Sequence, residues 1–213
     1  MLELNRLYLM DCMDGMRDFP DKHFELAICD PPYGININMN MGRKKGRRRD
    51  HAEKRWDNEA PNQEYFDELF RVSRNQIIWG GNYFRLPITK SWIFWDKEVP
   101  VGVSFADGEL AWTSFEKTLI KARIPYSGFI GSAGKIHPTQ KPIALYKWLL
   151  KNYAKKGDKI LDTHVGSASS LIACEDMGYE YIGFELDEDY FNAATKRLND
   201  FKAQVRMPLE GMC

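Results

Sequence analysis

Short apolar runs alternate with longer amphipathic stretches along the whole chain, and this alternation predicts an α/β fold. The runs are rich in aromatic and β-branched residues and have the length of buried strands. Seven segments have this character, at residues 6–10, 24–29, 76–80, 92–95, 109–113, 159–161 and 181–186. We therefore expect a sheet of seven strands.

Apolar positions recur at helical spacing between several of these strands. Residues 62–74 have this pattern, with Leu69 among the positions that should face inward. A second helix is expected over residues 145–153, and a third over residues 169–177, where Gly178 is a typical helix end. Helices that connect parallel strands cover both faces of a sheet.

The composition is that of an ordinary globular domain. The chain has 213 residues, and we expect one domain over residues 1–213. The net charge is zero, which argues against indiscriminate binding to nucleic acid.

The four cysteines show no C-x-x-C spacing, so we expect free thiols and no structural zinc. No signal peptide or membrane-spanning apolar run is evident, which favours a cytoplasmic protein without a membrane partner.

The most informative motif is Asp30-Pro31-Pro32-Tyr33-Gly34, which follows an apolar run and should project from the carboxyl end of a buried strand. The carboxylate of Asp30 and the carbonyl of Pro31 can each accept an N–H from a planar amino-bearing ring. Tyr33 can stack on the face of that ring, which could be adenine or cytosine. The alternative is that the two prolines only end a strand and start a turn.

A second motif surrounds Gly166, in a turn of small residues between a predicted strand and the helix 169–177. The glycine lets the backbone approach a ligand beside the helix amino terminus. Glu185 lies nineteen positions later, at the tip of the next strand, where an acidic residue can bind the two hydroxyls of a ribose. The alternative is that any βαβ unit needs such a turn.

A third motif, His137-Pro138-Thr139-Gln140-Lys141-Pro142, precedes the helix expected over residues 145–153. Its hydroxyl, amide and ammonium groups could bind a carboxylate. The alternative is an ordinary helix start, with Thr139 as the cap and Pro142 in the first turn.

A basic segment lies directly after the first motif, inside what we expect to be a mobile loop over residues 35–60. Its cations are positioned to attract phosphates, although a solvated charge run or a targeting signal would have the same composition. They are Arg43, Lys44, Lys45, Arg47, Arg48 and Arg49. After the strand 76–80, Gly80, Gly81 and Asn82 could leave space for a base and offer it an amide, or could simply form a tight turn.

Together, the three motifs resemble those of the DNA amino-methyltransferases, which use S-adenosylmethionine to methylate an exocyclic nitrogen of adenine or cytosine. The first matches the family's catalytic motif, and the third matches its methionine-binding motif. The glycine turn matches less closely, because His164 stands where the family usually has an aromatic residue. The resemblance implies a catalytic set of Asp30, Pro31, Pro32 and Tyr33. It implies a cofactor set of Asp11, His137, Thr139, Gln140, Lys141, Asp162, His164, Gly166, Ser167 and Glu185.

The order of the motifs implies the fold. The catalytic motif comes first and the glycine turn near the end, as in the permuted beta subgroup of the family. The resemblance therefore implies a Rossmann-like methyltransferase fold with a circularly permuted, mostly parallel sheet of seven strands and helices on both faces. Residues 6–10 would then be the third strand of the fold, with Asp11 reaching the adenine ring of the cofactor or acting only as a helix cap. Residues 96–136 would be an insertion or a small recognition region.

The resemblance implies a site-specific DNA methyltransferase that flips its target base out of the duplex and methylates N6 of adenine. Adenine is preferred because this motif in this order more often accompanies adenine enzymes in the family. Methylation of N4 of cytosine, methylation of RNA, and an inactive relative that only binds nucleic acid remain alternatives. The expected partner is double-stranded DNA in preference to RNA, and the expected state is a monomer or a homodimer.

Overall fold

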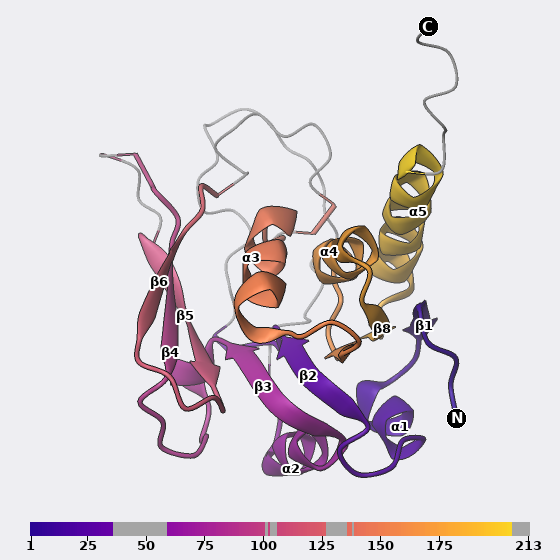
Figure 1. The fold of residues 1–213 in the computed structure, drawn as a ribbon, viewed down its shortest axis with the longest axis horizontal. Coiled ribbons are helices and arrows are strands. Elements are labelled where there is room, and N and C mark those ends of the chain that lie inside the picture. Colours follow the sequence, from indigo (N-terminus) through magenta and orange to yellow (C-terminus); the bar gives the residue numbers. More distant parts are fainter. Residues whose placement is uncertain (36–58, 101, 103–105, 127–135, 138, 206–213) are drawn as a thin grey trace, which may run out of the picture.

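A computed structural model describes residues 1–35, 59–100, 102, 106–126, 136–137 and 139–205. The described residues form one eight-stranded sheet with helices on both faces (Figure 1). The strands are β1 (Arg6–Leu9), β2 (Phe24–Cys29), β3 (Ser73–Trp79), β4 (Trp92–Asp96), β5 (Gly108–Thr113), β6 (Ile120–Arg123), β7 (Lys159–Asp162) and β8 (Glu180–Glu185). The helices are α1 (Cys12–Arg17), α2 (Gln63–Val72), the 3-10 turn η1 (Gly81–Tyr83), α3 (Ile143–Tyr153), α4 (Ser169–Met177) and α5 (Glu188–Val205).

The sheet order confirms the permuted arrangement. The strands run β1-β8-β7-β2-β3-β5-β4-β6, so the last two strands of the chain lie between its first two. From β1 to β3 all neighbours are parallel, with Leu9 opposite Glu185 and Leu26 opposite Ile160. Strand β5 is antiparallel to both β3 and β4. Five parallel carboxyl ends therefore share one edge of the sheet.

The strand count differs from the expected seven, because β6 adds an eighth strand that is parallel to β4 at the edge of the sheet. In this strand Ile120 and Ala122 alternate with Lys121 and Arg123, and only Ala122 is fully buried. A four-residue edge strand with two cations carries too little apolar signal to be detected. Strands β5 and β6 both fall within residues 96–136, so part of that predicted insertion belongs to the sheet itself.

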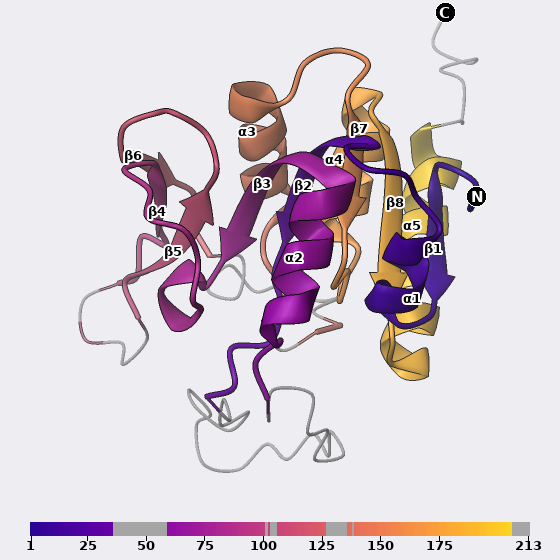
Figure 2. The same cartoon turned by 90° about the horizontal axis from the view of Figure 1, so that it is seen from below.

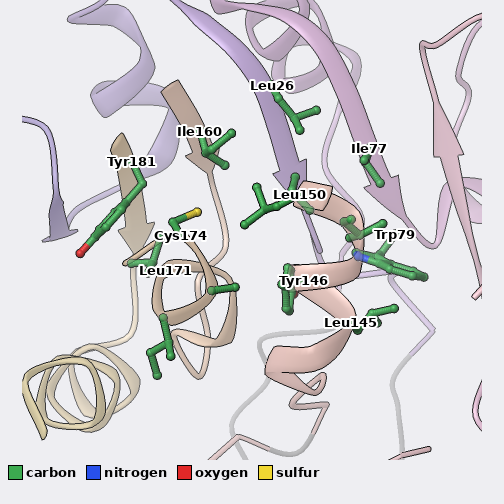
Figure 3. Packing of buried hydrophobic residues seen from close by; sticks show 14 of the residues in the cluster. Leu26, Ile77, Trp79, Leu145, Tyr146, Leu150, Ile160, Leu171, Cys174 and Tyr181 are labelled. Carbon is green, nitrogen blue, oxygen red and sulfur yellow. The ribbon is translucent and has the colours of Figure 1, made fainter. Parts of the chain in front are cut away.

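Two apolar clusters fill the space between the sheet and its helices, and Figure 2 shows helices α1 and α2 in front of the strands. Helices α3, α4 and α5 cover one face, and Figure 3 shows Leu145, Leu150 and Leu171 of this layer beside the strands. Helices α1 and α2 cover the other face, where Met16 and Leu69 are buried. None of the described helices combines the length and the apolar character needed to cross a membrane.

Local signals placed the predicted helices well. Helix α4 has the predicted bounds, and it ends at Gly178, whose φ of 73° is in the left-handed region that glycine favours. Helix α2 is capped by the Asn62 side chain but ends at Val72, because the chain turns directly into β3. Helices α1 and α5 were not among the expected ones, since α1 has only six residues and α5 is rich in polar residues.

Candidate active site

The carboxyl ends of the parallel strands bring distant motif residues to one cavity of about 580 Å³. Its walls come from the strand-to-helix connections that follow β1, β2, β7 and β8 and from the segment ahead of α3. The predicted residues that line it are Asp11, Asp30, Pro32, His137, Thr139, Gln140, Lys141, His164, Gly166, Ser167 and Glu185. Pro31, Tyr33 and Asp162 lie beside it, while Gly80, Gly81 and Asn82 are outside its lining.

Glu185 and Gly166, nineteen positions apart in the second motif, meet at the wall of the cavity. The Gly166 N–H donates to Glu185 Oε2 over 2.8 Å, and the Asp187 N–H donates to Glu185 Oε1 over 3.0 Å. Gly166 has a φ of 55°, which a residue with a side chain rarely adopts. Burial raises the pKa of Glu185, and its backbone donors oppose the shift. The carboxylate is thus held in place by the backbone at the cavity wall.

Asp162 lies below the glycine turn and orders it. Its Oδ1 accepts the N–H of His164 over 3.0 Å, and its Oδ2 accepts the hydroxyl of Ser170 at the start of α4. The residue is 2% exposed, and burial raises its pKa to about 7. Asp162 therefore connects the end of β7 to α4, and it is a support of the cavity rather than part of its lining.

His164 offers the cavity an uncharged ring. Burial lowers its pKa to about 4, a shift that Asp11 opposes, so the imidazole is neutral near pH 7. Nδ1 lies 2.9 Å from the Thr163 hydroxyl, and the ring meets the ring of Tyr65 edge-on at 5.4 Å. A neutral imidazole packed against the Tyr65 ring can offer a flat surface like that of the aromatic residue that the family usually has here.

Asp11 fills the structural role considered for it and also reaches the cavity. It caps α1, because its Oδ1 accepts the N–H of Met13 over 2.7 Å. It also lines the cavity, close to Glu185, because β1 and β8 end side by side. Contact with an adenine ring stays a prediction.

In the third motif, local bonds hold the polar groups that were expected to bind a carboxylate. The Thr139 hydroxyl lies 3.1 Å from His137 Nδ1, and Gln140 Oε1 accepts the N–H of Ile136 over 3.1 Å. The first helical residue of α3 is Ile143, and its N-cap is Pro142 rather than Thr139. The motif forms one wall of the cavity, with His137 packed edge-on against Tyr190 at 4.4 Å.

Lys141 pairs with carboxylates of the protein itself, one of them in the first motif. Its Nζ lies 2.5 Å from Asp30 Oδ2 and 3.1 Å from Glu109 Oε2, and its side chain is 2% exposed. Burial alone would lower the pKa of Lys141, but Asp30 and Glu109 outweigh it and leave the pKa raised. Burial raises the pKa of Asp30, and Lys141 opposes that shift. The ammonium is therefore charged and shared by two carboxylates.

Tyr33 is also held by the protein itself. Its hydroxyl donates to Asp30 Oδ1 over 2.8 Å, and its ring stacks on Tyr83 with centroids 5.0 Å apart and planes 16° apart. A Cβ on Gly80 would lie 2.2 Å from the Tyr33 ring, and one on Gly81 would lie 2.4 Å from Trp112. Aromatic side chains therefore occupy the space that a side chain at Gly80 or Gly81 would need. A base pocket beside these glycines stays a prediction.

Glu109, Tyr146 and Tyr190 belong to this site but were not identified from the sequence. Glu109 is near the start of a strand that has no unusual sequence pattern. Tyr146 is in an amphipathic helix, where an aromatic residue suggests only core packing. Tyr146 and Tyr190 line the cavity. A carboxylate on a mostly apolar strand was the one usable signal, because such a group needs a partner when buried.

Six candidate cations, Arg43, Lys44, Lys45, Arg47, Arg48 and Arg49, lie outside the described residues. Their contact with nucleic acid stays a prediction. Among the described residues no cluster of histidine, cysteine, aspartate or glutamate has the arrangement of a metal site.

Similarity to known proteins extends over most of the chain. Residues 78–196, more than half of the chain, match the family model described as DNA methylase. YubD of Escherichia coli (strain K12), which is named as a methylase, is 27% identical over 92% of this chain and 90% of its own length. The type II methyltransferase M.HinfI of Haemophilus influenzae is 24% identical over 93% of this chain and 69% of its own length.

Solved structures share the fold. The M1.HpyAVI–SAM complex has a TM-score of 0.58 at 20% identity, covering 90% of this chain and 98% of that one. PvuII DNA methyltransferase, described as cytosine-N4-specific, also has a TM-score of 0.58, at 14% identity, covering 93% of this chain and 91% of that one. At these identities the likeness concerns the fold alone.

Proposed function

The chain belongs to the DNA methylase family of S-adenosylmethionine-dependent amino-methyltransferases, and on that premise we propose that it methylates N6 of adenine in double-stranded DNA. The observation that carries the proposal is the position of Asp30, which lines the cavity just after β2, with Pro31 and Tyr33 beside it in the chain. An acceptor pair and an aromatic ring there suit a planar amino-bearing base.

The residues present fit S-adenosylmethionine as the cofactor. The cavity volume is in the range of small-molecule sites, and Glu185 and Asp11 offer carboxylates at adjacent strand ends for hydroxyl and amino groups. The neutral ring of His164 offers a flat surface beside them. We propose that Glu185 binds the ribose hydroxyls, and that Thr139 and Gln140 lie toward the methionine end.

When bound, the cofactor supplies an electrophilic methyl group whose bond to sulfur breaks with the electron pair staying on sulfur. The protein's part is to present the amino nitrogen with its lone pair toward that methyl group. Asp30 and the Pro31 carbonyl would accept the two N–H groups, and alignment of this kind supplies much of the rate. The nitrogen loses one proton after the new bond forms. Asp30 can accept it more readily than an ordinary aspartate, because burial raises its pKa.

In the proposed complex the base leaves the duplex, since a paired and stacked amino group cannot reach the cavity. The ring of Tyr33 would stack on the everted base. Tyr83, which now stacks on Tyr33, would then have to move away from that ring. The cations between residues 43 and 49 would contact phosphates, so DNA affinity should fall steeply with salt. Replacing Arg47, Arg48 and Arg49 by glutamine should lower the slope of log affinity against log salt by about 2–3.

Cytosine is the alternative acceptor, because both bases carry an amino group beside a ring nitrogen. The structurally similar PvuII enzyme is described as cytosine-N4-specific. Adenine is preferred on the resemblance of the catalytic motif to that of adenine enzymes.

The test is to incubate the purified protein with unmethylated genomic DNA and isotope-labelled S-adenosylmethionine, and then to digest the DNA to nucleosides for mass spectrometry. Label in N6-methyladenine supports the proposal. Label in N4-methylcytosine would mean that the target base is cytosine and not adenine. Cofactor binding without label in either nucleoside on any DNA contradicts the proposed reaction.

A further inference from the structure

Both carboxylate oxygens of Asp30 already have a partner in this structure, although the proposed reaction needs Asp30 for the target base. Its Oδ1 accepts the Tyr33 hydroxyl over 2.8 Å, and its Oδ2 accepts Lys141 Nζ over 2.5 Å. An ammonium this close weakens a carboxylate as an acceptor for a neutral amino group. Its charge also opposes the positive charge that the amino nitrogen gains as it takes the methyl group.

Lys141 cannot leave Asp30 without another anion. Its side chain is 2% exposed, and an ammonium removed from its counter-ion in such a place is strongly destabilised. Its remaining surroundings include the Tyr33 hydroxyl at 3.5 Å and the Trp79 ring at 5.2 Å from Nζ, and neither is an anion.

Glu109 on β5 is a prepared second position for the ammonium. Its Oε2 is buried and accepts no hydrogen bond from any described residue, although Lys141 Nζ lies only 3.1 Å away. The two groups form an ion pair at this distance, and a small movement of the ammonium would give it a direct hydrogen bond to Oε2. The other oxygen, Oε1, pairs with Lys97 Nζ over 2.6 Å, and Lys97 lies over the ring of Trp95. Lys97 therefore anchors the glutamate in place.

We propose that Glu109 is a positioning residue for methyl transfer, which takes Lys141 from Asp30 when the target amino group arrives. This role rests on the proposed function. It requires no change in net charge, because the ammonium passes between two carboxylates that it already touches. The Asp30 Oδ2 atom is then released for an N–H of the base.

Several groups around Asp30 affect its titration, and any pH experiment has to take them together. They are Lys141 ahead of α3, Tyr33 beside it, Glu109 on β5, Tyr146 on α3 and Asp162 on β7. Glu109 raises the pKa of Asp30, while Lys141 lowers it. Removing the charge of Glu109 therefore lowers the pKa of Asp30 and leaves Lys141 paired with Asp30 alone.

The experiment measures single-turnover methyl transfer to DNA at saturating S-adenosylmethionine. For Glu109→Gln we expect a rate about 10- to 100-fold lower than that of the parent protein, with unchanged cofactor affinity by calorimetry. The acid limb of its pH–rate profile should move to lower pH even though the plateau falls. Glu116→Gln, at an exposed glutamate after the same strand, is the matched control and should behave as the parent.

A second variant separates this role from a loss of folding. The proposal attributes the defect of Glu109→Gln to the ammonium of Lys141 staying on Asp30. The double variant Glu109→Gln, Lys141→Met should therefore transfer the methyl group faster than Glu109→Gln alone. Lys97→Met, which removes only the anchor, should give a smaller decrease in rate in the same direction. A parental rate in Glu109→Gln, or a double variant no faster than the single one, overturns the role of Glu109. A parent protein that methylates no DNA would overturn the proposed function instead.

Discussion

Two neighbouring regions of the site meet at Asp30 and differ in what fills them. The proposed cofactor region, bordered by Asp11, Gly166 and Glu185, is an open cavity whose polar side chains are fixed by backbone groups. The proposed base region, around Tyr33, is filled by the protein's own side chains: Lys141 pairs with the carboxylate of Asp30, and Tyr83 stacks on the ring of Tyr33.

The difference shows where the free energy of ligand binding is used. A cavity already shaped and already held by backbone donors needs little rearrangement, so binding energy there appears as affinity. A region in which side chains satisfy one another has to exchange those contacts for contacts with the base. We therefore expect cofactor binding to be insensitive to substitutions in the base region, and methyl transfer to be sensitive to them.

The largest effect is expected from Asp30→Ala, which removes the acceptor in the base region. Methyl transfer should fall by about 10³-fold or more, since alignment and charge at the amino group are both lost. Affinity for S-adenosylmethionine should stay within about twofold by calorimetry, because the cavity wall is otherwise intact. Circular dichroism checks folding, and a folded variant with full activity would refute the assignment of Asp30.

The next largest effect is a difference in stability between alanine substitutions at two glycines with positive φ, Gly80 in the base region and Gly166 in the cofactor region. An alanine Cβ at Gly80 would lie 2.2 Å from Tyr33, whereas one at Gly166 would lie 3.5 Å from His137. Both changes should cost about 1 kcal/mol for backbone strain, and Gly80→Ala should reach about 3 kcal/mol because Tyr33 has to move.

Urea unfolding measures both free energies, and Gly157→Ala supplies the control for strain alone, since no atom lies within 4 Å of its Cβ position. Equal destabilisation by Gly80→Ala and Gly166→Ala would show that the base region is no more tightly filled than the cofactor region.

A smaller effect is expected from Glu185→Ala, which acts only on the cofactor region. Affinity for S-adenosylmethionine should fall about 10- to 100-fold, because the cofactor hydroxyls lose a charged acceptor. The rate at saturating cofactor should change little. Glu180→Ala, at the opposite end of the same strand, is the control and should bind as the parent does. Unchanged affinity in Glu185→Ala would place the ribose elsewhere.

The smallest effect concerns the pH dependence of stability through Asp162. Its folded pKa is about 7, whereas an unfolded aspartate has a pKa near 3.9, so between these values the folded state binds more protons. Stability should fall as the pH rises through this window and level off above it. Asp162→Asn removes this dependence, so its stability relative to the parent should rise by roughly 1–3 kcal/mol between pH 4.5 and pH 8.

Urea unfolding at several pH values gives the comparison directly. The loss of one acceptor for Ser170 or His164 adds a constant that does not depend on pH, so only the slope is diagnostic. Parallel curves for the two proteins would mean that Asp162 is ionised throughout.

The sequence by itself determined most of the cofactor region. Strand β2 and helix α4 have their predicted bounds, and the spacing from Gly166 to Glu185 corresponds to a direct hydrogen bond. These features depend on local signals, namely apolar runs, a glycine at each turn and an acidic residue at a strand end. In a parallel sheet, such residues are gathered at one edge whatever the rest of the chain does.

Only the tertiary structure decided how the base region is arranged. Lys141 and Asp30 are 111 residues apart, and Glu109, which completes the group, lies on a strand that runs against its neighbours. The partner of the buried Lys141 ammonium depends on the charges and packing of three separate parts of the chain: the segment ahead of α3, the end of β2 and strand β5. No local pattern contains that sum, so the reasoning that predicted a ligand for Lys141 could not show that Lys141 pairs with the carboxylate of Asp30.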